Sequence, residues 1–452
     1  MAVRISAGRS AAATAEMVER PELGDGRRIG LFRLEGGLHA GAIGPAEGEI
    51  VERLVRTATG AGVPVVGVVA TSGADIAHGV ASLHAWGKVA RALADASGVV
   101  PTAVVVGGAC LSGPALLLGM VDVVVMARSA FAYVSGPDAV RRFTGAEVGH
   151  VELGGALVHQ TRTGLAWALA ADEDEALHLA LDVLSYLPPN NAEEPPFHGT
   201  GDPVDRDCAV AAAAVPSQAN SSYDVRTVVA DVVDAGSWVE AWAGHAANVV
   251  CGLATVAGHP VGVVANQPAA LAGALDIDGS VKAARLVQLC DSFNVALVTF
   301  VDTPGFQSGK DIQWRGMIRH GAELVHAYGA ATVPRVSVVL RKAYGGAYIV
   351  MDSQGLGSDV CLAWPSAEVA VMGAAGAISV LHRKRSLPDA ERRALEDDYA
   401  ARYCTPDQAA ERGFVDQVIR PVDTRRAVAT ALDALRTKRE HLPRRHHANT
   451  PL

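Results

Sequence analysis

Glycines that follow apolar runs are the residues of this 452-residue sequence whose type and spacing could do chemistry. In "RKAYGGAYIVM" (residues 341–351), Gly345 and Gly346 stand between two tyrosines and directly precede an apolar stretch. Glycine destabilises regular elements, so a pair of glycines usually marks a place where the backbone comes close to something else. Two further stretches place small residues where a strand leads into a helix: "GGACLSGPALL" (residues 107–117) and "VMGAAGAISVL" (residues 371–381).

These two stretches have the composition of an oxyanion site. Amides at a helix N-terminus lack an intrahelical acceptor, so they can donate to an anion. Such donors suit the enolate of a thioester and typically contribute ~2.7–4 kcal/mol each to its transition state. Close packing of a helix on a strand also requires small residues, and spacing alone leaves both explanations open.

Other chemistries are poorly supported by the sequence. "GFQSGKD" (residues 305–311) imitates a phosphate loop, but it has three residues between the glycines instead of four, and Asp311 stands where Ser or Thr should hold magnesium. No serine-hydrolase elbow and no dinucleotide fingerprint is present. His159, His446 and His447 form no metal-binding pattern, and a lone histidine is more often structural. The six cysteines are scattered, which indicates structural thiols in a reducing cytoplasm and no zinc site.

Composition narrows the class of protein further. Half of the residues are apolar and 19% are charged, so the chain can bury the cores of two domains. The net charge of -9 argues against a nucleic-acid partner. Residues 101–121 carry no charge, but glycines and Pro114 interrupt them, so we expect a strand, turn and helix there and no membrane span. Residues 1–28 lack the apolar core of a signal peptide, and we expect a flexible or helical lead-in.

The elements that position the glycines alternate between strand and helix. Short β-branched runs each end in Gly or small polar residues and lead into a helical stretch, for example "VPVVGVVATSGAD", "VALVTFVDTPGF" and "RVSVVLRKAYGG". This alternation is typical of an α/β fold with buried strands. A segment rich in Pro, Asn and Asp (residues 185–210) predicts a domain boundary near Asp205, and residues 423–445 predict an amphipathic closing helix.

Several long motifs resemble the carboxyltransferase (β) subunit of biotin-dependent acyl-CoA carboxylases of the propionyl/acetyl-CoA type. The second half carries "VALVTFVDTPGF", "RKAYGGAYIVM", "LAWPSAEVAVMGAAGAISVLHRK" and "AAERGFVDQVIRPVDTRRAV". The first half is similar but weaker, through "SGADIAHGVASL", "VSGPDAVRRFTGAEV" and "ELGGALVH". The second half is covered almost throughout.

The resemblance implies two crotonase-like domains in tandem, residues 1–205 on the acyl-CoA side and residues 206–452 on the biotin side. It also implies a homohexamer built as a trimer of dimers, with a biotin carboxylase/biotin carboxyl carrier (α) subunit as partner and no metal in this subunit. In this family carboxybiotin releases CO2, the biotin nitrogen takes the α-proton of the acyl-CoA, and the enolate attacks CO2. No side-chain base is required, because the biotin nitrogen takes the proton while backbone oxyanion holes hold the charge.

Roles follow from the matching positions. Gly376 and Ala377 match the oxyanion pair that faces the biotin ureido oxygen, and Ser112 and Gly113 match the pair of the first half. Ser379 matches the position that lines the acyl pocket. The resemblance places Gly73 and Ala74 in the substrate site, and it places these residues against biotin: Gly345, Gly346, Gly305 and Phe306.

The first half departs from the family at the positions expected to bind the acceptor. The usual Gly-Gly has become Ser112-Gly113, a cation has become Asp75, and an acid has become His78. The family's N-terminal helical region is largely absent before Gly24. Two other hypotheses therefore stay open: a biotin-independent crotonase-type decarboxylase or acyl-transfer enzyme, and a non-catalytic scaffold subunit paired with an active paralogous β subunit.

Overall fold

Two compact units make up the chain. The computed structural model describes residues 5–10, 12–24, 26–35, 38–218, 221–440, 442–443, 446, 449 and 451. Unit 1 comprises the residues up to Pro196 together with Ala241–His245 and Ser292–Asn294; unit 2 comprises Phe197–Glu240, Ala246–Asp291 and the residues from Val295 onward. The chain thus leaves unit 1 at Pro196, within the Pro-rich segment and a few residues before Asp205.

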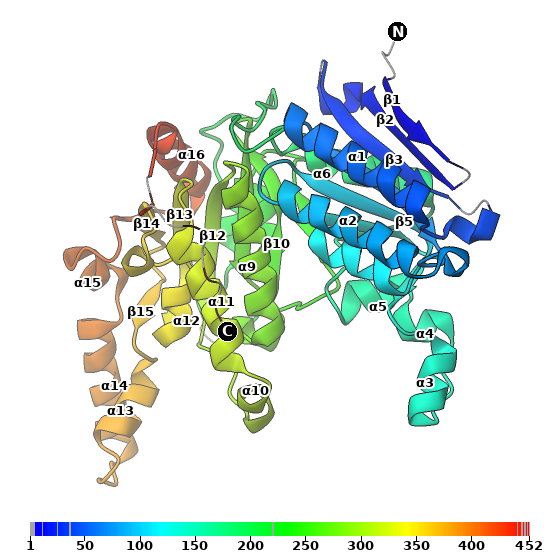
Figure 1. The fold of residues 1–452 in the computed structure, drawn as a ribbon. Helices are drawn as coiled ribbons and strands as arrows, with labels where there is room; N and C mark the ends of the chain where they lie inside the picture. Colours follow the sequence, from blue (N-terminus) through cyan, green and yellow to red (C-terminus); the bar gives the residue numbers. More distant parts are fainter. Residues whose placement is uncertain are drawn as a thin grey trace. The chain divides into compact units, whose positions relative to one another are not determined.

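Unit 1 is built on an eight-stranded sheet with helices against it (Figure 1). The strand order is β1-β2-β3-β4-β5-β6-β8, and β7 pairs with the far end of β5. From β3 onward the pairing is parallel. The elements are β1 (Ile5–Arg9), β2 (Ala13–Glu19), β3 (Arg28–Leu34), η2 (Leu38–Gly41), α1 (Pro45–Ala61), β4 (Val65–Thr71), η3 (Ile76–His78), α2 (Val80–Ala96), β5 (Thr102–Leu111), η4 (Gly113–Met120), β6 (Val123–Ala127), β7 (Phe131–Tyr133), α3 (Pro137–Thr144), α4 (His150–Gly154), α5 (Ala156–Thr161), β8 (Ala168–Ala170) and α6 (Glu173–Ser185).

Unit 2 repeats this arrangement with the order β16-β14-β13-β12-β11-β10-β9, and β15 pairs with the far end of β13. From β11 onward the pairing is parallel. Its elements are α7 (Ala209–Ala214), α8 (Val225–Val232), β9 (Val239–Ala241), β10 (Val249–Val256), β11 (His259–Asn266), η5 (Leu271–Gly273), α9 (Ile277–Ser292), β12 (Ala296–Thr303), α10 (Lys310–Trp314), α11 (Met317–Ala330), β13 (Arg335–Tyr344), α12 (Gly345–Val350), β14 (Val360–Ala363), β15 (Glu368–Ala370), α13 (Ala374–Leu381), α14 (Asp389–Tyr403), α15 (Pro406–Glu411), β16 (Gln417–Val418) and α16 (Thr424–Leu435).

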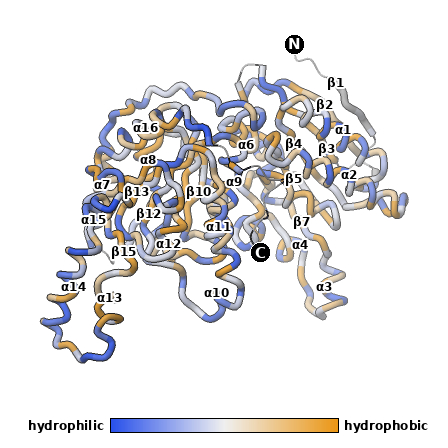
Figure 2. The backbone as a smooth tube through the Cα atoms, turned by 60° about the vertical axis from the view of Figure 1, so that its left-hand side comes forward, coloured by the Kyte–Doolittle hydropathy of each residue, from blue (hydrophilic) through white to orange (hydrophobic). Residues whose placement is uncertain are grey.

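The predicted strands form as expected because their apolar runs are buried on both faces. Val263, Val298 and Val338 come from three neighbouring strands of unit 2 and lie in one hydrophobic cluster. Strands covered on both faces lose the alternating pattern and become continuously apolar. In Figure 2 the hydrophobic colour accordingly concentrates in strands such as β12 and β13, whereas α14 is mainly hydrophilic. The predicted closing helix is α16.

The expected flexible or helical lead-in is wrong for the described residues before Gly24. They form β1 and β2, and β2 pairs with β3 in an antiparallel register. Buried Ala13, Ala15 and Met17 alternate with outward-facing residues, which is the period of a strand. The hairpin thereby extends the sheet beyond β3.

No helix in the described part of the chain is long and apolar enough to cross a membrane. Residues 101–121 instead form β5 and the 3₁₀ helix η4.

Candidate active site

The turn after β4 leaves one backbone donor without an acceptor. The Gly73 amide donates to Thr71 Oγ1 at 3.1 Å, and the Gly73 carbonyl accepts from the Ile43 amide at 2.8 Å. The Asp75 amide then donates to the Ile43 carbonyl at 3.0 Å. Among the described residues, the Ala74 amide between these bonds has no acceptor. The turn therefore fixes the position of the Ala74 N–H and leaves it able to donate a hydrogen bond to a ligand.

Unit 2 repeats this turn after β12. The Gly305 amide lies 3.3 Å from Thr303 Oγ1, and the Leu275 amide donates to the Gly305 carbonyl at 3.1 Å. The Gln307 amide donates to the Leu275 carbonyl at 2.7 Å, and in the part of the chain that is described the Phe306 amide has no acceptor. Ala74 and Phe306 are thus equivalent positions of the two units.

The end of β5 corrects the expected oxyanion pair of unit 1. The Ser112 amide donates to the Tyr133 carbonyl at 2.9 Å, so it continues the pairing of β5 with β7 and cannot serve a reactant at the same time. No hydrogen bond from the Gly113 amide is present within the described residues. The expectation that both amides are available is therefore wrong for Ser112 and keeps only Gly113.

The turn after β4 and the end of β5 meet in one corner of unit 1. A Cβ on Gly73 would lie 3.0 Å from Ser112 Cβ and 3.1 Å from the Leu111 carbonyl oxygen. A Cβ on Gly113 would lie 2.9 Å from Cζ2 of Trp86, which comes from α2. The glycines are needed here because the two chain segments approach closely. Five residues were expected on the acyl side, and the corner brings together four of them: Gly73, Ala74, Ser112 and Gly113.

The residues expected on the biotin side also come together, within unit 2. A Cβ on Gly346 would lie 3.5 Å from the ring of Phe306, so the ends of β12 and β13 are neighbours. Gly345 has a φ of +61°, which favours glycine, and a Cβ there would lie 3.2 Å from the Val371 carbonyl oxygen. Val371 leads into α13, so the start of this helix joins the same edge of the sheet.

The first turn of α13 corrects the second expected pair. The Ala377 amide donates to the Gly373 carbonyl at 3.1 Å and is the first amide bonded within the helix. The Gly376 amide precedes it, is exposed, and has no acceptor among the described residues. Ala377 is therefore not available as a donor, whereas Gly376 is. Ser379 is exposed three residues further on, a spacing that places it on the same face as Gly376.

Side chains around α13 fix its starting point. The Tyr344 hydroxyl donates to Glu368 Oε2, and a Cβ on Gly373 would lie 3.3 Å from the Tyr344 ring. Burial, followed by the hydrogen bond to Glu368, raises the pKa of Tyr344, so this group stays a neutral donor. Burial and the neighbouring Arg341 lower the pKa of Lys342 on the same strand. Tyr344 thus ties β13 to β15 at the point from which α13 departs.

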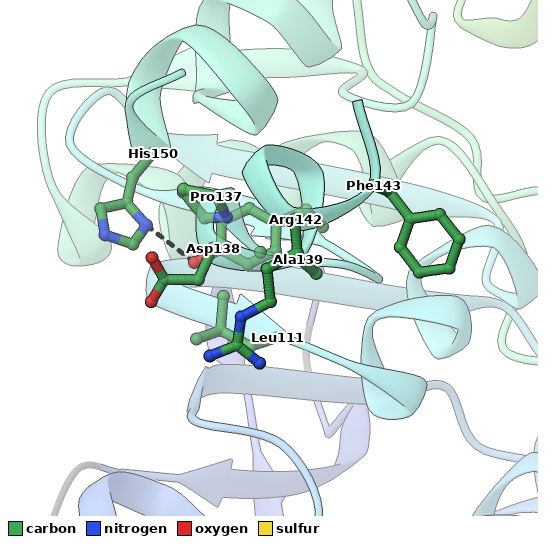
Figure 3. A pocket seen from close by; sticks show the side chains of 9 residues that line it. Leu111, Pro137, Asp138, Ala139, Arg142, Phe143 and His150 are labelled. Carbon is green, nitrogen blue, oxygen red and sulfur yellow. Dashed lines mark hydrogen bonds between the residues drawn. The ribbon is translucent and has the colours of Figure 1, made fainter. Parts of the chain in front are cut away.

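A pocket of about 560 Å3 opens beside the corner of unit 1 (Figure 3). It is lined by Leu111, Tyr133, Gly136, Pro137, Asp138, Ala139, Arg142, Phe143 and His150. The Tyr133 hydroxyl and His150 Nδ1 are 2.7 Å apart, and the two rings stack. This volume suits an acyl chain or part of a cofactor. Most of the lining residues belong to the quoted stretch "VSGPDAVRRFTGAEV" (residues 134–148), but Leu111, Tyr133 and His150 come from other elements, so the sequence did not show that a pocket forms here.

The chain resembles known proteins along nearly its whole length. Residues 24–450 match the carboxyl transferase domain family. The chain belongs to this family. The propionyl-CoA carboxylase beta chain of Saccharopolyspora erythraea is 43% identical over 445 residues, which cover 95% of this chain and 82% of that one. The methylmalonyl-CoA decarboxylase subunit alpha of Veillonella parvula is 39% identical over 429 residues, covering 95% and 84%.

A solved carboxyl transferase structure has the same fold. The transcarboxylase 12S crystal structure, described as a hexamer with methylmalonyl-coenzyme A and methylmalonic acid bound, superposes with a TM-score of 0.94. It is 40% identical, and the match covers 98% of this chain and 85% of that one. The family resemblance and the tandem crotonase-like α/β fold are therefore confirmed. The chain is therefore an enzyme, a biotin-dependent acyl-CoA carboxyltransferase.

The described residues contain no group of three or more His, Cys, Asp or Glu side chains arranged to hold a metal ion. The expected His446–His447 pair lies partly outside the described residues, since His447 is not among them. His159 is structural: its Nε2 lies 2.8 Å from the Ala132 carbonyl oxygen and its Nδ1 lies 3.0 Å from Thr163 Oγ1.

Proposed function

We propose that this chain transfers a carboxyl group between carboxybiotin, carried by a partner subunit, and the α-carbon of an acyl-CoA of the acetyl or propionyl type. The observation that carries the proposal is the repeated turn, in which Ala74 and Phe306 each have an amide held in place with no acceptor among the described residues. A carboxyl transfer through an enolate needs such donors and needs no side-chain nucleophile.

On the acyl side, unit 1 holds the thioester oxygen between the amides of Ala74 and Gly113. Both belong to the corner where Gly73 meets Ser112, and the rigid turn at Thr71 fixes one of them. Two amides that are already oriented stabilise the developing enolate oxygen without reorganisation when the reaction occurs. The pocket lined by Tyr133 and His150 lies next to this corner and offers room for part of the acyl-CoA.

On the biotin side, unit 2 offers backbone amides to a ureido oxygen. The available donors are the Gly376 amide on α13 and the Phe306 amide, and Gly346 keeps the space beside the Phe306 ring free of a side chain. These features fit a flat, neutral ring with one carbonyl acceptor. Bound carboxybiotin would supply the carboxyl group, and Ser379 is exposed on the same face of α13 as Gly376.

The relatives support an assembly with other chains. The 12S structure is described as a hexamer, and the relative from Saccharopolyspora erythraea is named a beta chain. Large apolar side chains are exposed on each unit: Ile76, Val80, Phe143, Trp314, Ile318, Val380 and Leu381. We infer a homo-oligomer, built as a hexamer, with a biotin carboxylase/carrier subunit as partner, which light scattering on the purified chain will test.

The decisive experiment requires no partner protein. Purified chain is incubated with methylmalonyl-CoA, with or without free biotin, and propionyl-CoA is measured by mass spectrometry. We expect propionyl-CoA to form only when biotin is present. Product without biotin would favour a biotin-independent decarboxylase, and no product under either condition would favour a scaffold subunit; either result would overturn the proposal.

A further inference from the structure

Two histidines and one aspartate form a cluster at the acyl-side corner of unit 1. His39 lies on η2, His78 lies on η3, and the Nδ1 atom of each is 3.1 Å from Oδ2 of Asp75. The Asp75 side chain is 10% exposed, whereas the two imidazoles are 52% and 54% exposed. Nε2 of neither ring has a partner among the described residues.

Asp75 is held firmly and stays ionised. Its Oδ1 accepts from the Ala77 amide at 2.9 Å, and its carbonyl accepts from the Ser82 hydroxyl at 2.7 Å. The hydrogen bond from Ala77, followed by that from His39, lowers the pKa of this carboxyl. An ionised carboxylate only accepts, so a neutral imidazole beside it carries its proton on Nδ1. Nε2 then bears the lone pair, as in a catalytic Asp–His pair.

The fold does not require this cluster, because unit 2 builds the same backbone without it. His39 and Ala40 have φ values of 58° and 52°, and the equivalent Leu271 and Ala272 have 50° and 54°. The residue after the free amide is Asp75 in unit 1 and Gln307 in unit 2. His78 follows Ala74 by four residues, and the residue at the equivalent position of unit 2, four residues after Phe306, is Lys310. Strained loops and matching turns therefore form with no imidazole present.

The cluster lies beside the amide that the proposed function assigns to the thioester. Ala74 directly precedes Asp75, and successive Cα atoms are ~3.8 Å apart. The α-carbon of an acyl-CoA is one bond from the carbonyl carbon whose oxygen the Ala74 amide would hold. The carboxylate of Glu47 from α1 also lies near His78, and its Oε2 accepts from the Gly44 amide at 3.1 Å.

We propose that the His39–Asp75–His78 cluster supplies a side-chain base that removes and returns the α-proton of a bound acyl-CoA in the absence of biotin. This inference rests on the proposed function, which places the thioester at Ala74. The Cα–H bond breaks and an Nε2–H bond forms, while the C–H electron pair becomes the enolate held by the Ala74 and Gly113 amides. The reverse step returns a solvent-derived proton to carbon, so the net reaction is hydrogen exchange and needs no other reactant.

The test is deuterium incorporation into propionyl-CoA in D2O without biotin, measured by mass spectrometry. A positioned general base typically contributes ~10²–10⁴-fold, so we expect incorporation by the wild-type chain and at least tenfold slower incorporation by D75N and by the double variant H39Q/H78Q. H84Q is the matched control, because His84 is exposed on α2 outside the cluster. We expect H84Q to exchange at the wild-type rate.

Biotin-dependent turnover of methylmalonyl-CoA is measured on the same samples, and thermal unfolding confirms that each variant is folded. Wild-type turnover without any deuterium incorporation would overturn this inference and leave the proposed function standing. Incorporation at the wild-type rate in folded H39Q/H78Q would also overturn it. Absence of both activities in the wild type would instead remove the proposed function itself.

Discussion

The Ser112 amide donates to the Tyr133 carbonyl at 2.9 Å, and this bond holds Ser112 at φ 64° and ψ −151°. Only glycine adopts this region readily, and other residues lose about 1–3 kcal/mol there. The strain is the cost of extending the β5–β7 pairing by one residue beyond Leu111. The amide of the next residue, Gly113, does not take part in this pairing and has no acceptor among the described residues.

Replacing the strained residue should stabilise the protein. We expect Ser112→Gly to raise the free energy of unfolding by about 1 kcal/mol, since the relief of strain exceeds the added chain entropy. Chemical denaturation measures the change. Ser97→Gly is the control, because Ser97 is exposed and has a φ of −57°; it should give no gain. If S112G is no more stable than S97G, the backbone at Ser112 does not lower the stability of the protein.

Gly113 should tolerate no side chain. Its Cβ would lie 2.9 Å from Trp86 Cζ2, so either the ring or the amide must move. A displacement of ~1 Å at a reacting group can cost about 100-fold, and we expect Gly113→Ala to lower kcat/KM for methylmalonyl-CoA at least tenfold in the biotin-dependent assay. Gly119→Ala in the same helix has no atom within 4 Å of the new Cβ and should retain wild-type activity. If both variants are equally active, Gly113 is not part of the active site.

Two substitutions at Gly376 distinguish the role of its amide from that of its missing side chain. Proline at this third helical position removes an N–H that no helix bond uses, so we expect Gly376→Pro to lower kcat about 10²–10³-fold with the fold preserved. Alanine keeps the N–H, and its Cβ would lie 3.5 Å from Met372 Sδ, an ordinary contact. Gly376→Ala should therefore keep activity and add ~1 kcal/mol of stability. If G376P retains full turnover, the donor lies elsewhere.

The cysteines should be unreactive in the folded protein. All six are buried, and burial raises the pKa of Cys110 and Cys251 to about 12 and that of Cys361 to about 11. The thiolate is the reactive form, so we expect no reaction with a disulfide reagent at pH 8 and six thiols titrated in guanidinium. Rapid modification of the native chain, or loss of turnover on alkylation, would show that one thiol is accessible.

The sequence predicted the elements well where periodicity was strong. β4, β5, β12 and β13 are buried on both faces, so their apolar runs are unbroken and recognisable. β2 was missed because small alanines form most of its buried face, and a face of alanines has little hydrophobic contrast. Its partner β3 supplies the larger side chains.

The site residues stay a prediction, but the structure shows which of them lie together. Gly73 lies close to Ser112, and Gly346 lies close to Phe306. Whether an amide is available depends on its acceptor, and the acceptor of Ser112 is Tyr133, which lies on another strand. For Ala377 the acceptor is Gly373, four residues earlier, so the answer depends on the residue at which α13 begins. Sequence patterns place helix ends only to within a few residues.

The β1–β2 hairpin has a practical consequence for anyone trimming this protein. The family match begins at residue 24, so a domain cut to that boundary would lose both strands and expose the main-chain groups of β3 that pair with β2. An unpaired edge strand can form main-chain hydrogen bonds with strands of neighbouring molecules. A protein shortened to residue 24 should consequently aggregate on purification.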